Sequence, residues 1–182
     1  FFLYVPYTMP HVPLFASEKF RDTSRRGLFG DVIEEIDWSV GQINATLDRL
    51  GLSENTLVMF TSDNGPWMTQ FQNGGTAGQL RGAKGDTWEG GMREPFAARW
   101  PGRIPAGTVS LEPGSTLDFF PTLVRLAGGT IPNDRPYDGT DLMPVLQGGP
   151  GPERTIYYYR GEYLRALRKG KWKIHFSYQE NN

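Results

Sequence analysis

The residues best suited to chemistry lie between positions 58 and 95, where an apolar run ends and a glycine-rich stretch follows. Asp63 and Asn64 stand side by side directly after that run, just before a Gly65-Pro66 turn. Carboxylate and amide oxygens are ligands that hard cations such as Ca²⁺ or Mg²⁺ bind. Two ligands do not complete a metal site, and Asp-Asn-Gly is also a common turn sequence. The pattern therefore leaves a metal site and a plain turn both open.

Lys84 lies in the same stretch, between the small residues Ala83 and Gly85. Small residues let the backbone approach a ligand closely. An ammonium group held there would bind an anionic group as a point charge. The alternative is a solvated lysine on a loop.

His11 is a third candidate, enclosed between Pro10 and Pro13. Proline fixes its own φ and favours extended geometry in the residue before it, so the backbone around His11 is stiff. A histidine held in this way would serve as a proton donor or base, and a solvated or structurally bonded histidine is the alternative. A cation bound by oxygens, a lysine and a histidine together indicate the handling of a phosphate or sulfate group.

The first third of the chain predicts the scaffold for these candidates. Residues 1–5 form a short apolar run typical of a strand, and residues 56–62 predict a second strand. Between them, residues 30–50 place apolar side chains at intervals of three and four, which predicts an amphipathic helix. A strand–helix–strand order favours a parallel sheet. Asp63 and Asn64 would then lie at its carboxyl edge, where ligands bind in open α/β folds.

The rest of the chain predicts shorter elements. Residues 95–101 resemble a strand, and residues 115–127 a helix in which Pro121 predicts a kink or a later start. Residues 141–146 predict one helical turn. Beyond a run of glycines and prolines, three short strands indicate the beginning of an antiparallel sheet: residues 156–159, 163–167 and 172–176.

Composition excludes several classes of function. The formal charge of −1 shows no excess of the positive charge that is typical of proteins that bind nucleic acid. No apolar run reaches the roughly 20 residues that a transmembrane helix needs, so we expect neither nucleic-acid nor membrane partners. The absence of cysteine excludes disulfides and a thiol nucleophile within these residues.

Two stretches together resemble the C-terminal half of the catalytic domain of type I sulfatases, of the arylsulfatase kind. They are FTSDNGP at residues 60–66 and GAKGDTWEGGMREP at residues 82–95. The resemblance extends over nearly the whole chain, and the combined motifs are far more specific than any one of them. It implies an α/β fold like that of alkaline phosphatase, with a mixed or mostly parallel sheet sandwiched by helices and the start of a smaller antiparallel sheet. Residues 1–150 would belong to the catalytic domain and residues 151–182 to the small C-terminal subdomain.

The resemblance also implies a chemistry. Asp63 and Asn64 would bind Ca²⁺, and Lys84 and His11 would contact the sulfate and act at the leaving oxygen. A hydrated formylglycine, made from a Cys or Ser in a Cys/Ser-x-Pro-x-Arg motif, would attack sulfur. His175 lies in a Lys-x-His-Phe segment and is a candidate for substrate binding. The substrate would be a sulfated small molecule or sulfated glycan, and the location secreted, periplasmic or lysosomal.

This sequence departs from the family pattern in one respect. It has no cysteine, and no serine is followed by x-Pro-x-Arg, so the nucleophile is expected upstream of Phe1. The aspartate pair that completes the calcium site is expected there too. We therefore expect the isolated chain to be inactive.

Two other functions stay open. A phosphodiesterase or phosphonate hydrolase of the same superfamily would use a threonine nucleophile. A non-catalytic module that binds sulfated glycans would keep the cation and Lys84 without a nucleophile. The sequence upstream of Phe1 would separate these from a sulfatase.

Overall fold

The computed structural model describes residues 1–176 of the 182-residue chain. Its α-helices are α1 (Gly27–Arg49), α2 (Glu89–Met92), α3 (Phe119–Leu126) and α4 (Met143–Leu146). Its strands are β1 (Val58–Thr61), β2 (Phe96–Arg99), β3 (Thr155–Arg160), β4 (Tyr163–Lys169) and β5 (Trp172–His175). Short 3-10 helices are η1 (Ser53–Asn55), η2 (Met68–Asn73) and η3 (Thr116–Asp118). None of the described helices is long and apolar enough to cross a membrane.

The long helix α1 confirms the prediction from apolar spacing. Its end is set by Gly51, which has a φ of +68°, a conformation that glycine adopts at little cost. There the amide of Leu52 donates to the carbonyl of Leu47 at 2.9 Å, and that of Gly51 to Asp48 at 3.1 Å. These bonds satisfy carbonyls that the helix end leaves unpaired.

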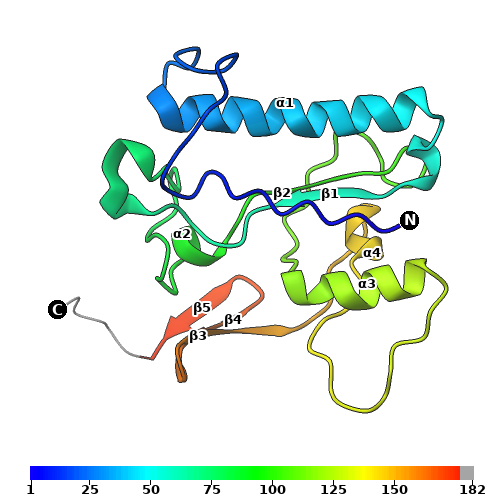
Figure 1. Ribbon diagram of the computed structural model, residues 1–182. Helices are drawn as coiled ribbons and strands as arrows, with labels where there is room; N and C mark the ends of the chain where they lie inside the picture. Colours follow the sequence, from blue (N-terminus) through cyan, green and yellow to red (C-terminus); the bar gives the residue numbers. More distant parts are fainter. Residues whose placement is uncertain (177–182) are drawn as a thin grey trace.

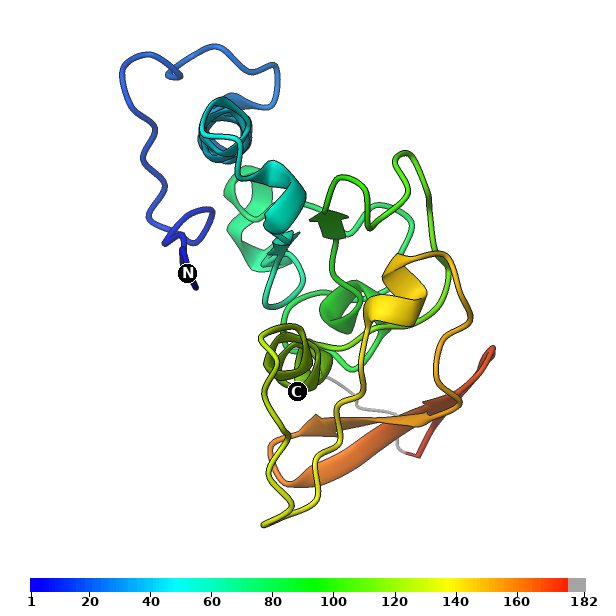
Figure 2. The same ribbon diagram turned by 90° about the vertical axis from the view of Figure 1, so that its right-hand side faces the viewer.

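Strands β1 and β2 form an antiparallel pair in which Val58 lies opposite Arg99 and Thr61 opposite Phe96. Helices α1 and α3 lie on opposite sides of this pair (Figures 1 and 2). The predicted strands at residues 56–62 and 95–101 are confirmed in their central residues.

The prediction of a strand at residues 1–5 is wrong for the structure as described, and so is its parallel pairing. This segment has no strand partner among residues 1–176, and its aromatic side chains are exposed, with Phe1 at 88%. Apolar, β-prone composition alone does not make a strand, because a strand needs a neighbour for its backbone hydrogen bonds.

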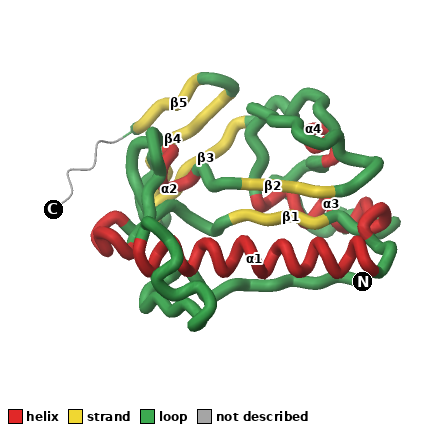
Figure 3. Tube along the Cα trace, turned by 90° about the horizontal axis from the view of Figure 1, so that it is seen from above, coloured by secondary structure: helices red, strands yellow, loops and turns green. Residues whose placement is uncertain are grey.

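The residues that follow instead pack along α1. Leu14 and Ala16 form a buried cluster with Val32 and Ile36 of the helix, and the hydroxyl groups of Tyr7 and Ser39 are 2.9 Å apart. Figure 3 shows this segment running beside α1 over much of its length. The contact brings the loop that carries His11 back to the rest of the chain.

The three C-terminal strands form a separate antiparallel sheet in the order β3-β4-β5, as the sequence predicts. Gly170, with a φ of +55°, makes the tight turn between β4 and β5. Tyr158 and Ala166 are the buried side chains of this sheet. Phe176, which the sequence assigns to the last strand, lies just beyond β5, and residues 177–182 of the predicted subdomain lie outside the described residues.

One buried carboxylate joins α3 to the small sheet. Asp118 is fully buried and accepts hydrogen bonds from both terminal nitrogens of Arg154 at 2.7 Å. It also accepts from the amides of Ser115 and Thr140, each at 2.8 Å. Burial opposes ionisation of Asp118, but these bonds and the Arg154 charge outweigh it and lower the pKa of the carboxyl group. Asp118 thus ties the start of α3 to the chain entering β3.

We expect Asp118→Asn to reduce the free energy of unfolding by about 3–5 kcal/mol, because it leaves the guanidinium of Arg154 without its charged partner. Urea unfolding of the whole protein measures this. Since the pKa of Asp118 is lower in the folded chain, its stabilisation is present above the ordinary aspartate pKa of about 4 and declines as pH falls below that.

The matched control is Asp134→Asn. Asp134 pairs with Arg135 at 2.8 Å but is half exposed, so its loss should cost less than about 1 kcal/mol. Equal losses in the two variants would contradict a central role for Asp118.

Candidate active site

Asp63 and Asn64 follow β1 after Ser62, on a loop that is hydrogen-bonded to the segment around α2. The amide of Gly65 donates to the carbonyl of Gly91 at 3.3 Å. A Cβ added to Gly65 would overlap the carbonyl oxygen of Gly90, so only glycine permits this approach. The Asp63 carboxylate is exposed, and Asn64 is half buried.

Lys84 lies at the tip of a tight turn. The amide of Ala83 donates to the Asp86 carboxylate at 2.9 Å, and the amide of Asp86 donates back to the carbonyl of Ala83 at 2.9 Å. The Lys84 amide donates to the carbonyl of Pro66 at 2.9 Å, which joins this turn to the loop that carries Asp63 and Asn64.

Backbone of the Lys84 loop packs against the two glycines of α2. A Cβ on Gly90 would overlap the carbonyl of Gly82, and a Cβ on Gly91 would overlap the carbonyls of Ala83 and Asp86. The two glycines at the start of α2 therefore lie between the two loops that carry the candidate residues. Gly85, which directly follows Lys84, has nothing within 4 Å of an added Cβ, so approach of a ligand to the backbone there stays a prediction.

His11 and Lys84 meet at one aromatic ring. The imidazole of His11 is 5.4 Å from the indole of Trp67, centre to centre, and the Lys84 ammonium is 5.1 Å from the centre of the same indole. A cation over an indole face is attracted by the ring quadrupole. Both side chains are exposed, so they are available to a ligand. The structure thus brings together two candidates that lie far apart in the sequence.

The ring nitrogens of His11 have distinct roles. Nδ1 is 2.7 Å from the carbonyl oxygen of Val12, and a carbonyl oxygen only accepts hydrogen bonds. Nδ1 therefore carries a proton, and Nε2 is the nitrogen left for a ligand.

His175 is held on the other side of the Lys84 loop. Its ring stacks on Trp88 with centres 3.8 Å apart. Its Nε2 is buried and has no hydrogen-bond partner among the described residues. Burial, and then the charges of Lys173 and Arg81, lower the pKa of His175, which favours the neutral ring.

Glu89 at the start of α2 links the small sheet to this loop. Its carboxylate accepts hydrogen bonds from Lys173 at 2.8 Å and from Arg168 at 3.2 Å. Lys173 also donates to the carbonyl of Thr87 at 2.6 Å. Burial opposes ionisation of Glu89, but the bond from Lys173 and the nearby positive charges outweigh it and lower the pKa of the carboxyl group. Figure 3 shows α2 beside the small sheet.

Oxygen ligands for a cation are present at the Asp63 loop, although incomplete. Within residues 1–176 no three His, Asp or Glu side chains gather closely enough to hold a metal. Oε1 of Glu94 is buried without a hydrogen-bond partner among these residues. Burial, and then the negative charge of Asp63, raise the pKa of Glu94. A site with two nearby carboxylates and no paired cation fits a divalent ion whose other ligands come from elsewhere.

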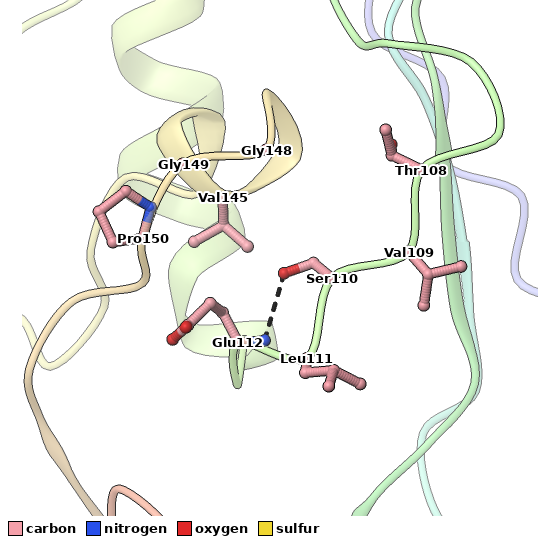
Figure 4. A pocket seen from close by; sticks show the side chains of 9 residues that line it. All are labelled: Thr108, Val109, Ser110, Leu111, Glu112, Val145, Gly148, Gly149 and Pro150. Carbon is pink, nitrogen blue, oxygen red and sulfur yellow. Dashed lines mark hydrogen bonds between the residues drawn. The ribbon is translucent and has the colours of Figure 1, made fainter.

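An open hollow lies away from these residues. It has a volume of about 310 Å³ and is lined by residues 108–112, Val145 and residues 148–150. Figure 4 shows Glu112 as its one charged side chain, with the Glu112 amide bonded to the hydroxyl of Ser110. None of the candidate site residues lines it, so it is not the site described above.

Sequence reasoning missed the roles of the aromatic side chains and of Glu89. Trp67 and Trp88 organise the cationic residues, and Glu89 holds two basic residues of the small sheet. The aromatic residues near Lys84 were a visible signal. Nothing in the local sequence of Glu89 indicates partners more than 75 residues away.

A family profile described as Sulfatase matches residues 1–129. Among curated proteins, N-acetylgalactosamine-6-sulfatase of Canis lupus familiaris is 50% identical over 177 residues, covering 97% of this chain and 34% of that protein. Steryl-sulfatase of Rattus norvegicus is 44% identical over 184 residues, with 97% and 31% covered. The chain thus spans about a third of the length of these relatives.

Solved structures of related proteins are also similar to this chain. The PsFucS1 sulfatase from Pseudoalteromonas sp. matches with a TM-score of 0.85 and 35% identity, over 91% of this chain and 34% of that one. Ps i-CgsB in complex with k-i-k-neocarrahexaose matches with a TM-score of 0.78 and 30% identity, over 91% and 38%. The described chain is mixed α/β with a small antiparallel sheet, which agrees with the fold predicted from the family resemblance.

We expect Gly91→Ala to lower the stability of the whole protein by about 1–3 kcal/mol, because the new methyl group must displace two backbone carbonyls. Thermal unfolding measures this loss. The control is Gly41→Ala in α1, where a Cβ meets nothing within 4 Å and alanine should stabilise the helix by about 0.5–1 kcal/mol. Equal transition temperatures for Gly91→Ala and wild type would show that the glycine contact does not position the loops.

Proposed function

Because this chain belongs to the sulfatase family, we propose that the whole protein hydrolyses sulfate esters, with His11 and Lys84 contacting the sulfate group. The observation that carries this proposal is the meeting of the two side chains at Trp67. One site thus presents a positive charge and a proton donor, which are two of the groups that assist cleavage of an ester of a strong acid.

Lys84 stabilises negative charge on the sulfate oxygens. Its ammonium group has no carboxylate within ion-pair distance among residues 1–176, so its charge is available to the substrate. The bond from its amide to Pro66 fixes the backbone beneath it. Such preorganised charge lowers the barrier more than a mobile lysine would.

His11 acts at the leaving oxygen. As the sulfur–oxygen bond breaks, the oxygen of the alcohol gains negative charge, and protonated His11 donates a proton to it from Nε2. The bond from Nδ1 to Val12 occupies that nitrogen and leaves Nε2 as the nitrogen available to the substrate.

Asp63 and Asn64 would hold Ca²⁺ beside the sulfate, together with ligands from outside this chain. When bound, that ion supplies charge stabilisation for the sulfate oxygens. A formylglycine nucleophile would also come from outside this chain, since the residues given contain neither a cysteine nor a Ser-x-Pro-x-Arg sequence.

A sulfated sugar is the substrate class that we propose. The names of the related proteins support this choice: one is named N-acetylgalactosamine-6-sulfatase, and another is described in complex with k-i-k-neocarrahexaose. Residues 151–182 as a separate subdomain, and a secreted, periplasmic or lysosomal location, stay predictions.

We expect Lys84→Ala to lower kcat/KM of the whole protein by about 10²–10³-fold for every sulfate ester, because it removes transition-state charge stabilisation. His11→Ala should behave differently. For 4-nitrophenyl sulfate, whose leaving group needs little protonation, the loss should be small; for an alkyl or sugar sulfate it should reach about 10²–10⁴-fold.

Steady-state kinetics with both esters, and with 4-nitrophenyl phosphate, test these expectations. Lys171→Ala, an exposed lysine in the turn between β4 and β5, is the control. Equal losses for both leaving groups in His11→Ala would refute its role as the acid. Hydrolysis of the phosphate in preference to the sulfates would overturn the proposed function.

Asp63→Asn should weaken Ca²⁺ binding by the whole protein at least tenfold, because it removes one carboxylate from the coordination of a hard cation. Calorimetric titration of metal-free protein with Ca²⁺ measures this without any turnover. The control is Asp37→Asn, which changes an exposed carboxylate on α1. Unchanged Ca²⁺ affinity in Asp63→Asn would show that the Asp63 loop is only a turn.

A further inference from the structure

Trp88 carries a polar side chain on each face. The guanidinium carbon of Arg81 lies 3.8 Å from the centre of the indole ring, and the His175 ring is also centred 3.8 Å away. Two groups at this distance over one ring centre would collide on the same face, so they lie on opposite faces. The three side chains form a stack in which Arg81 and Trp88 come from the Lys84 loop and His175 from β5.

The charge of Arg81 is not used within the described chain. Arg81 is exposed, and its guanidinium makes no hydrogen bond or ion pair with any residue in 1–176. The nearby carboxylate of Glu89 is already shared by Lys173 and Arg168. An arginine ordered by stacking, with its donors free, is suited to bind a planar carboxylate or a sulfate through paired hydrogen bonds.

Arg81 also has a fixed place relative to Lys84. The carbonyl of Arg81 accepts a hydrogen bond from the amide of Gly90 at 2.7 Å, which closes the neck of the loop. The turn from Ala83 to Asp86 closes its tip. Two cationic groups are thus carried by one short, internally bonded loop.

We propose that Arg81 binds a second anionic group of the substrate, a carboxylate or sulfate on the sugar adjoining the one that carries the cleaved ester, and that His175 positions Arg81 through Trp88. This inference rests on the proposed sulfatase function and names a specificity determinant for it. It also changes the role expected for His175.

His175 acts on Arg81 by stacking, and its Nε2 does not donate to the ligand. Its Nε2 is buried, so this nitrogen is closed to substrate. His175 supplies a stacking contact with Trp88, in which the two rings lie at an interplanar angle of 29°. An aromatic residue without nitrogen should therefore replace it.

The test compares kcat/KM of the whole protein for substrates with one and two anionic groups. The single-anion substrate is 4-nitrophenyl sulfate. The two-anion substrates are a monosulfated disaccharide with a uronate and a disulfated disaccharide, each measured beside its counterpart in which the second group is a neutral hydroxyl. For each disaccharide, the measured quantity is kcat/KM of the two-anion substrate divided by kcat/KM of its neutral counterpart.

We expect Arg81→Gln to lower this ratio by about tenfold to a hundredfold, the size of one charge-assisted pair. Arg81→Lys, which keeps the charge but not the paired donors, should give an intermediate ratio. His175→Ala should lower the ratio, and His175→Phe should restore it because the stack is kept. Whichever disaccharide shows the dependence on Arg81 identifies the group as carboxylate or sulfate.

The matched control is Arg103→Gln, since Arg103 also lies over a tryptophan, with its guanidinium carbon 5.0 Å from the centre of Trp100. The kcat/KM ratio of the Arg103→Gln variant should equal that of wild type. If wild type cleaves sulfate esters but Arg81→Gln leaves both ratios unchanged, the second-anion site is refuted and the sulfatase function stands. If wild type cleaves no sulfate ester, the proposed function itself fails. Failure of His175→Phe to restore the ratio would refute the positioning role.

Discussion

The close backbone contact at Gly90 and Gly91 determines where the candidate catalytic residues lie. These two glycines touch the Asp63 loop on one side and the Lys84 loop on the other, and a side chain at either position would separate the loops. The spacing between the proposed metal ligands and the proposed sulfate-binding lysine is therefore set by backbone packing. Backbone contacts of this kind leave less freedom than contacts between long side chains.

A second constraint comes from the small sheet. Glu89 begins α2, one residue before this glycine pair, and it is held by Lys173 and Arg168 of the sheet. Half-buried ion pairs contribute modestly to stability because desolvation offsets much of the attraction. Their geometry nevertheless fixes the sheet against the loop. Through this contact β5 brings His175 onto Trp88, so the small sheet β3-β4-β5 packs against the loop that carries Lys84.

Much of the fold is predictable from local sequence, since helices and turns depend on nearby residues. The apolar spacing of residues 30–50 predicts α1, and Pro121 and Ser115 predict the irregular start of α3, which the structure shows as a 3-10 turn followed by an α-helix. The strand predicted at residues 1–5 fails because pairing depends on a neighbour that composition does not reveal.

The site is predictable to a smaller degree. Asp63, Asn64, Lys84 and His11 are indicated by residue type and by family resemblance, and their assignment as ligands and acid stays a prediction. The contacts that arrange them are not readable from the sequence. Those between His11 and Trp67, and between Lys173 and Glu89, join segments far apart along the chain. Spacing carries no information about such tertiary contacts.

Trp67 and Trp88 hold Lys84 and Arg81 in place without neutralising their positive charges. Lys84 and Arg81 lie on one short loop, and a carboxylate placed to neutralise either of them would compete with an anionic substrate. An indole face attracts a cation without supplying a negative charge. Trp67 holds Lys84 and Trp88 holds Arg81, so both cations are ordered while their charge stays available. Glu89, the carboxylate nearby, is instead occupied by Lys173 and Arg168. The Lys84 loop thereby keeps two unneutralised cations where we propose that the anionic substrate binds.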